Sequence, residues 1–308
     1  MNQLKKYHTG RAFGALLGIA FCGVSIVAAP LSAQTAPAVA APSAGAANIN
    51  ITPRRVIFDR NKRTEAVYVF NQGNAAVTVD VALIDNVMLP SGEIVPVSRA
   101  AEKGPAAVAA AATIKSAKPL LLAAPSRLVL GPGQGKTVRV RASFPDAAEG
   151  AEYRSHLTVT TVPPADSGLT AEQAAAAQRG ELVLRIQSIF GLSIPLIVRS
   201  GAINGTASFG MITGGSDNGV NENGKGVLLV PIRRSGTNSV YGNVEARVGK
   251  NEVIGLVRGL AVYPEVNERL ATIPLLRPLR KGEVVTVRYF AEEAKPGTSL
   301  ASGSFTAP

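Results

Sequence analysis

The feature that most limits the possible folds is an apolar stretch over residues 181–199, ELVLRIQSIFGLSIPLIVR. It is too apolar for a surface loop, and too short and interrupted for a membrane-spanning helix, which needs about 20 apolar residues. Its even-numbered positions include the large apolar side chains Leu182, Leu184, Ile186, Phe190 and Leu192. In a β-strand, alternate side chains point to opposite faces of the sheet. The stretch is therefore either a core strand buried on both faces or a long strand that also lends apolar side chains to another protein.

The N-terminus is typical of a secretory signal peptide, which we assign to residues 1–33. A basic start is followed by an apolar segment over 13–29, and small residues permit cleavage after Ala33. An uncleaved anchor helix is the alternative. Residues 34–47 are rich in Ala and Pro and are expected to form a flexible leader. The single cysteine, Cys22, lies within the signal, so the mature chain is expected to have neither disulfides nor thiol chemistry.

The formal net charge of the chain is +11, which raises the question of nucleic-acid binding. The basic residues are scattered rather than gathered in a block, and only 5% of the residues are aromatic. A secreted address without an aromatic stacking platform argues against a nucleic-acid partner. We interpret the charge as a basic surface that attracts acidic protein partners.

The remaining sequence predicts an all-β fold with two domains, at 48–199 and 200–308. Short β-rich runs alternate with turns at regular spacing, which is typical of antiparallel sandwiches. Residues 97–124 interrupt the first domain with an Ala-rich sequence, interpreted as an inserted surface loop with one helical turn over 108–112. After Arg199, Gly and Asn become frequent, and further strand-like runs predict a second β-rich domain.

Motifs for catalysis are lacking. GPGQGKT at 131–137 has Leu130 where a phosphate-binding loop needs glycine, and a strand rather than a helix follows it. His156 is the single histidine of the mature chain and is expected to be structural. Its neighbour Ser155 would point to the opposite face of a strand, so the two cannot act as nucleophile and base. We therefore expect no enzyme activity, no metal site and no cofactor.

Arg54 and Arg55 form an unusual pair, because they lie inside the apolar run ITPRRVIF. In an extended strand, one of the two must point inward or into a cleft, although a surface pair beside a turn is the alternative. A guanidinium fixed in a cleft is suited to a carboxylate, which it can hold with two parallel hydrogen bonds.

Four segments, in order, resemble the periplasmic pilus and fimbrial assembly chaperones, the PapD-like family. Residues 51–85 are similar to the opening strands of that family, with Arg-x-x-Phe-Asp and Asn-x-Gly-Asn elements. RLVLGPGQGKTVRVRAS at 127–143 is similar to its Pro-Gly-Gln turn and the Arg-bearing strand after it. EYRSHLTVTTVPP at 152–164 and IFGLSIPLIVR at 189–199 resemble the strand before its long loop and the long seventh strand. The second domain matches in length and β character.

This resemblance implies two immunoglobulin-like β-sandwich domains in a boomerang arrangement. It also implies donor-strand complementation, in which the long strand completes a pilin or fimbrial subunit that lacks its last strand. The subunit-binding residues would then be Arg55, Leu182, Leu184, Ile186 and Phe190. In the family, an Arg and a Lys hold the C-terminal carboxylate of the subunit; Arg55 matches the first, but the second falls near Pro195, which has no charge. This departure suggests a divergent member.

The leading hypothesis is thus a periplasmic chaperone that delivers subunits to an outer-membrane, usher-type platform for fimbrium biogenesis and cell wall organization. When free, such a protein could cap itself as a dimer. The alternative is a secreted structural or adhesive β-sandwich protein that becomes part of a surface fibre.

Overall fold

The computed structural model describes residues 48–144, 151–163, 175, 177–180, 188–202, 204–215, 226–292 and 297–308. The expected signal peptide at 1–33 and leader at 34–47 lie outside these residues, so both stay predictions. In the described part of the chain, no helix has the length and apolarity needed to cross a membrane.

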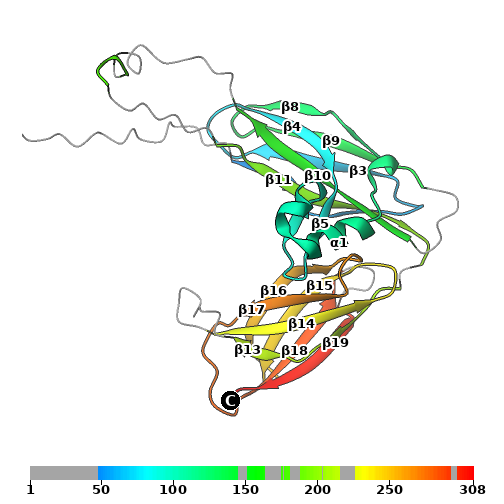
Figure 1. Cartoon of the computed structure of the whole chain (residues 1–308), viewed down its shortest axis with the longest axis vertical. Helices are drawn as coiled ribbons and strands as arrows, with labels where there is room; N and C mark the ends of the chain where they lie inside the picture. The colour runs from blue at the N-terminus through cyan, green and yellow to red at the C-terminus, as the bar shows by residue number, and fades with distance from the viewer. Residues whose placement is uncertain are drawn as a thin grey trace, which may run out of the picture. The chain divides into compact units, whose positions relative to one another are not determined.

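Two sheets form a first β sandwich (Figure 1). One has the order β1-β3-β9-β7 and the other the order β2-β11-β10-β4-β8. The strands of the first sheet are β1 (Ile49–Thr52), β3 (Thr64–Asn71), β9 (Gly135–Ala142) and β7 (Leu121–Ala124). Those of the second are β2 (Val56–Phe58), β11 (Gly191–Ser200), β10 (Ala151–Val162), β4 (Val77–Ile84) and β8 (Arg127–Leu130).

Later strands form a second sandwich. One sheet has the order β12-β14-β13 with β17 also paired to β14, and the other has the order β16-β15-β18-β19. The strands of the first are β12 (Thr206–Phe209), β14 (Val227–Ser235), β13 (Thr213–Gly215) and β17 (Glu268–Pro274). Those of the second are β16 (Glu252–Val262), β15 (Val240–Val248), β18 (Val284–Ala291) and β19 (Ser299–Thr306). The predicted all-β fold of two immunoglobulin-like β sandwiches is confirmed.

Alternating side chains build a separate core in each sandwich. On β9, Val138, Val140 and Ala142 are buried, whereas the residues between them are exposed, as the two-residue period of a strand requires. The core of the second sandwich also contains residues from earlier in the chain, since Ile197 of β11 and Met88 belong to its apolar cluster. Side chains from the first sandwich therefore pack into the core of the second.

The predicted strand ITPRRVIF is divided between the two sheets of the first sandwich. β1 pairs antiparallel with β3, and β2 pairs parallel with β11. Pro53 lies between them, where it fixes its own φ and donates no ladder hydrogen bond. The chain thus changes sheets over residues 53–55, and this change places Arg54 and Arg55 outside regular pairing.

The interpretation of residues 97–124 as a surface loop with one helical turn is wrong in two respects. An η1 turn (Val97–Lys103) leads into α1 (Pro105–Thr113), which is longer than one turn and buries Ala107 and Ala110. After η2 (Lys118–Leu120), β7 joins the first sheet by pairing with β9. Alanine favours helix, and α1 packs against the hairpin of β5 (Asn86–Met88) and β6 (Ile94–Pro96), which the sequence did not reveal.

The apolar stretch that constrains the fold is described as a strand from Gly191 to Ser200, which is β11. Its even row continues as Ile194, Leu196 and Val198, all buried in the first core. Leu182, Leu184 and Ile186 lie outside the described residues, so their assigned role stays a prediction.

Candidate functional site

β11 has one edge that is only partly covered. It pairs with β10 along its whole length, from Gly191 opposite Thr160 to Ser200 opposite Ala151. On its other edge, β2 covers only Leu196–Val198. Across the described residues, no strand pairs with that edge over 191–195. Such an edge presents backbone groups that can pair with another strand.

The register shows which backbone groups face this open edge. The N–H of Thr161 donates to the carbonyl of Phe190 at 2.8 Å, so this opposing pair is hydrogen-bonded. Because bonded and non-bonded pairs alternate in an antiparallel ladder, even-numbered residues of β11 bond toward β10. Gly191 and Ser193 therefore point N–H and C=O groups to the open edge, and Pro195 points a carbonyl there but has no N–H.

The even-numbered row of β11, which is buried from Ile194 onward, begins with two exposed apolar side chains. Phe190 is 49% exposed and Leu192 is 38% exposed, whereas Ile194 is buried. Phe190 and Leu192 therefore belong to the same row of side chains as the residues of β11 that fill the core of the first sandwich. A strand added at the open edge would extend the same sheet, so its inward side chains would lie beside Leu192 and Phe190.

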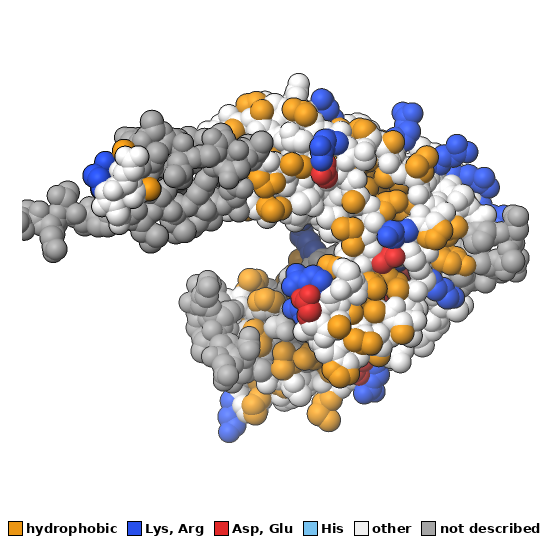
Figure 2. All heavy atoms as spheres, turned by 45° about the horizontal axis from the view of Figure 1, so that its top comes forward, with side chains coloured by type: hydrophobic (Ala, Val, Ile, Leu, Met, Phe, Trp, Pro, Cys, Tyr) orange, Lys and Arg blue, Asp and Glu red, His pale blue; other side chains and the backbone are white. Residues whose placement is uncertain are grey.

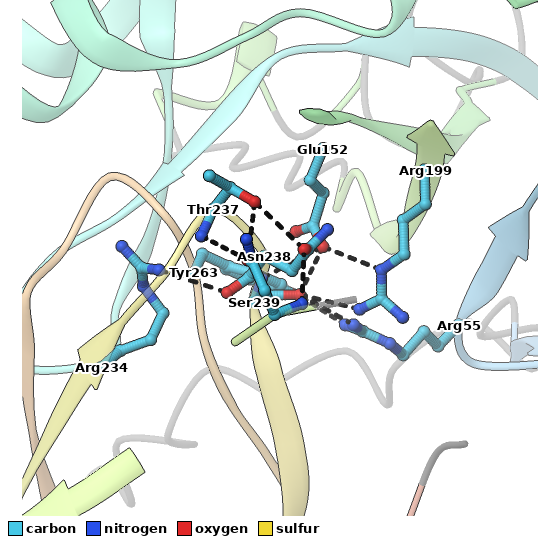
Figure 3. A network of polar contacts seen from close by, with 9 residues as sticks. Arg55, Glu152, Arg199, Arg234, Thr237, Asn238, Ser239 and Tyr263 are labelled. Carbon is cyan, nitrogen blue, oxygen red and sulfur yellow. Dashed lines mark hydrogen bonds and ion pairs between the residues drawn. The ribbon is translucent and has the colours of Figure 1, made fainter. Parts of the chain in front are cut away.

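Arg55 is the inward member of the arginine pair: it is half-buried and Arg54 is exposed. Its guanidinium donates to the hydroxyl of Tyr263 and to Oγ of Ser239, each at 3.3 Å. It also stacks over the ring of Tyr241, 4.4 Å from the ring centroid. These contacts, which come from the second sandwich, fix the position of the cation at the junction of the two sandwiches (Figure 3).

A buried ion pair lies beside Arg55 in the same network (Figure 3). Nε of Arg199 donates to Oε2 of Glu152 at 2.9 Å, and both side chains are almost fully buried. The two residues are direct cross-strand neighbours on β10 and β11. Ser239 reaches the same carboxylate oxygen from the second sandwich, through its backbone N–H at 3.1 Å and its hydroxyl at 3.0 Å. The ion pair thus joins the two sandwiches.

Arg234 holds the loop that carries Ser239. Its guanidinium donates to the carbonyls of Gly236 at 2.6 Å, Asn238 at 3.2 Å and Pro264 at 3.2 Å. Burial lowers the pKa of Arg234 from its ordinary value. The three carbonyl contacts position the backbone of this loop so that Ser239 faces Glu152.

A second buried ion pair joins Arg154 of β10 to Glu265. Nη1 of Arg154 donates to Oε2 of Glu265 at 3.0 Å, and Nη2 donates to the carbonyl of Asn86 at 3.0 Å. The guanidinium also lies 3.7 Å from the centroid of the Tyr263 ring. Glu265 in turn accepts the backbone N–H of Met88 at 2.8 Å. Both ion pairs connect β10 to the second sandwich.

The outer face of the β11 sheet carries a pocket of about 390 Å³, which we call the β11 pocket. Ser193 and Pro195 of β11 line one side, and His156 of β10 lies opposite Pro195 in the register. Tyr263 also lines it. The position that lacks the expected second cation, Pro195, is therefore part of a pocket wall.

His156 is buried and stays neutral. Burial, with the charges of Arg154 and Arg55 nearby, lowers its pKa to about 3. The unfolded chain has the ordinary value of about 6.5 and binds more protons between these limits, so stability is lost as the pH falls from 6.5 toward 3. Through this residue, lowering the pH from 7 to 5 should reduce the free energy of unfolding by about 2 kcal/mol.

We predict that His156→Gln removes this part of the pH dependence. Urea unfolding of both proteins at pH 7 and pH 5 measures it, because contributions from the carboxylates cancel in the difference. An equal loss of stability in both proteins would show that His156 is not held neutral in the fold.

Sequence reasoning singled out Arg55 as a candidate but did not identify the residues of the second sandwich that contact it. Ser239, Tyr241 and Tyr263 are far along the chain from Arg55, and no local pattern links them to it. The sequence gives one weak indication of the buried ion pair. Glu152 lies at the start of an apolar strand, and a charged side chain that is buried there requires a partner of opposite charge.

Basic side chains are distributed rather than clustered on the face of the molecule that Figure 2 shows. In Figure 2, Lys and Arg side chains are scattered over the face shown and are more prominent than Asp and Glu. Some are paired on the surface, as Arg233 is with Glu268 at 2.7 Å. The distribution agrees with the sequence, in which no basic block occurs.

No protein-family model matches the chain, and no curated protein sequence matches it. Solved structures do match. The chain is similar to the YadV chaperone, with 13% identity and a TM-score of 0.42 over 84% of this chain and 98% of that chain. It is similar to the E. coli chaperone DraB, with 15% identity and a TM-score of 0.41 over 85% and 98%. A structure of the Salmonella enterica SafA pilin in complex with the SafB chaperone matches with 16% identity and a TM-score of 0.42 over 84% and 96%.

Proposed function

We propose that the chain is a periplasmic assembly chaperone for pilus or fimbrial subunits and that it acts by binding rather than catalysis. It holds a subunit that lacks a strand by donating β11 and the residues before it. It then passes the subunit to an outer-membrane, usher-type platform. The signal peptide at 1–33 supplies the route to the periplasm.

The observation that carries this proposal is the open edge of β11 over 191–195. An incomplete β sandwich has an exposed edge and an unfilled core. The open edge supplies backbone hydrogen bonds, and Phe190 and Leu192 supply apolar side chains beside it. Leu182, Leu184 and Ile186 have the same parity, and we propose that they extend this row.

The sequence resemblance gives separate support. The four family-like segments include both the switch between β1 and β2 and β11 as far as Arg199.

Co-purification tests the proposal. A tagged chain isolated from the cell envelope should carry one bound subunit, begin at or near Gln34, and be missing from the assembled fibre. Recovery of the chain as an integral part of the fibre would instead establish the structural alternative.

We propose that Arg55 binds the C-terminal carboxylate of the subunit. Arg55→Ala should weaken binding of a peptide that copies this C-terminus by about 1.5–3 kcal/mol, the usual contribution of a hydrogen bond to a charged group. Arg55→Lys should restore part of the loss, because lysine keeps the charge but lacks the planar fork. Calorimetric titration measures each affinity.

Amidation of the peptide provides the matched control. It should weaken binding to the wild-type protein and have little further effect on Arg55→Ala, since the same contact is then already absent. If amidation weakens binding to both proteins equally, the carboxylate binds elsewhere and this assignment of Arg55 is wrong.

A further inference from the structure

The β11 pocket contains hydrogen-bonding capacity that the fold does not use. Asn86 and His156 both line it and are both more than nine-tenths buried. Oδ1 of Asn86 and Nδ1 of His156 have no hydrogen-bond partner among the described residues. Buried polar atoms are rarely left in this state, so an occupant that pairs with them would gain more than it would at a solvated surface.

The two hydroxyls of the pocket and the amide nitrogen of Asn86 are already engaged with one another. The hydroxyls of Thr158 and Ser193 are 2.8 Å apart, and Nδ2 of Asn86 donates to the Ser193 hydroxyl at 3.4 Å. The unused atom of Asn86 is therefore an acceptor, and it requires a donor from the occupant. The neutral ring of His156 can present either an N–H or a lone pair.

The charges near the pocket select against a positively charged occupant, and the hydrogen-bonding type of its unused atoms selects against a carboxylate. His156 is neutral because it is buried near Arg154 and Arg55, and these cations would also repel an ammonium or guanidinium group. A carboxylate brings acceptors alone and cannot satisfy Oδ1 of Asn86. An uncharged hydroxyl can both donate and accept a hydrogen bond, so it is suited to Oδ1 of Asn86 and to Nδ1 of His156.

The walls are suited to a ring. Ile94, Pro96 and Pro195 line the pocket with Tyr263, which gives flat apolar surfaces around the polar base. A volume of about 390 Å³ lies in the range of pockets that hold ring-sized ligands.

The pocket lies where a strand paired to β11 would place a side chain. Ser193 and Pro195 are on the odd row of β11, whose side chains face outward from the first core, and the same residues face the open edge with their backbone groups. A partner strand places every second side chain on this outer face, with Cβ atoms about 4.5–5.5 Å from those of β11. One such side chain would lie at the pocket.

We propose that the β11 pocket is a specificity site that binds one tyrosine-like side chain, an uncharged ring ending in a hydroxyl, from the strand paired with β11. The identification of that strand as part of a subunit rests on the proposed function. The chemistry of the pocket does not, because it depends on atoms of this chain.

The test uses the full mature chain and four small probes that share one ring and differ at its tip. These are p-cresol, toluene, 4-methylbenzoate and 4-methylbenzylammonium, titrated by NMR while the amide signals of His156 and Ser193 are followed. One hydrogen bond should make p-cresol bind about threefold to tenfold more tightly than toluene. Both charged probes should bind more weakly than p-cresol. The proposal is overturned if toluene binds as tightly, if a charged probe binds most tightly, or if p-cresol does not saturate.

Two variants locate the binding. Asn86→Leu removes the acceptor and should reduce p-cresol to the affinity of toluene, while Asn50→Leu, the same substitution on β1, should leave it unchanged. Ile94→Trp narrows the pocket from a half-exposed position and should abolish the p-cresol shifts even if Asn86→Leu does not fold. Unchanged p-cresol binding in Ile94→Trp would place the probe elsewhere and overturn the proposal. Since no subunit is present, a negative result would leave the co-purification test of the proposed function intact.

Discussion

Replacing Glu152 with alanine should lower the free energy of unfolding by about 3–5 kcal/mol, the usual cost of leaving one member of a buried ion pair without its partner. Glu152 accepts from Arg199 and, twice, from Ser239, and its side chain is fully buried. Its removal leaves the Arg199 guanidinium buried beside Arg55 without the carboxylate. Urea unfolding at pH 7 measures the loss.

Glu268→Ala is the matched control, since Glu268 pairs with Arg233 on the surface, where both side chains are about half exposed. Exposed pairs contribute about 0–1 kcal/mol, so this variant should stay close to the wild-type protein. Adding Arg199→Met to Glu152→Ala should recover part of the loss, because the buried charge is then removed. Equal effects of Glu152→Ala and Glu268→Ala would contradict the role given to the buried network.

The double variant Phe190→Asp with Leu192→Asp should weaken subunit binding by about 100-fold while leaving the fold intact. Each large apolar side chain buried on binding contributes roughly 1.5–3 kcal/mol, and the lower value applies because both are half-covered in the free protein. Two such losses amount to about 3 kcal/mol, and each 1.4 kcal/mol is a factor of ten. Titration with the co-purified subunit measures the change.

Val129→Asp supplies the control for this prediction. Val129 is 56% exposed on β8, at the far edge of the same sheet. The substitution adds one carboxylate, half the charge of the double variant, at a similar exposure, and it should alter neither binding nor stability. If the double variant unfolds the protein, Phe190 and Leu192 contribute to the core and not to a binding surface.

Much of the fold could be predicted from local sequence patterns, because buried and exposed side chains alternate along a strand and the sequence shows this alternation directly. The period of two along β9 and the buried row of β11 can both be read from the sequence. The turn at 131–135 was likewise correctly distinguished from a phosphate-binding loop, since β9 follows it. The Ala-rich insert was misread because its structure depends on packing of α1 against β5, which is a tertiary contact.

The candidate site was harder to predict because it is assembled from distant parts of the chain. The sequence indicated that one of Arg54 and Arg55 points inward, and the structure shows that it is Arg55. What holds Arg55, however, comes from Ser239 and Tyr263, about 200 residues later. The β11 pocket has the same origin, since its unused polar atoms are recognisable only after β5 and β10 are brought together.

The central claim is that the open edge of β11 pairs with a strand of the partner, and amide hydrogen exchange tests it residue by residue. The N–H groups of Gly191 and Ser193 face the open edge, whereas those of Leu192 and Ile194 face β10. In the free protein, the N–H groups of Gly191 and Ser193 should exchange fast, and those of Leu192 and Ile194 should exchange slowly. Binding of the co-purified subunit should slow Gly191 and Ser193 strongly and leave Leu192 and Ile194 nearly unchanged. If Gly191 and Ser193 exchange at the same rate with and without the subunit, β11 does not donate its edge and the account is contradicted.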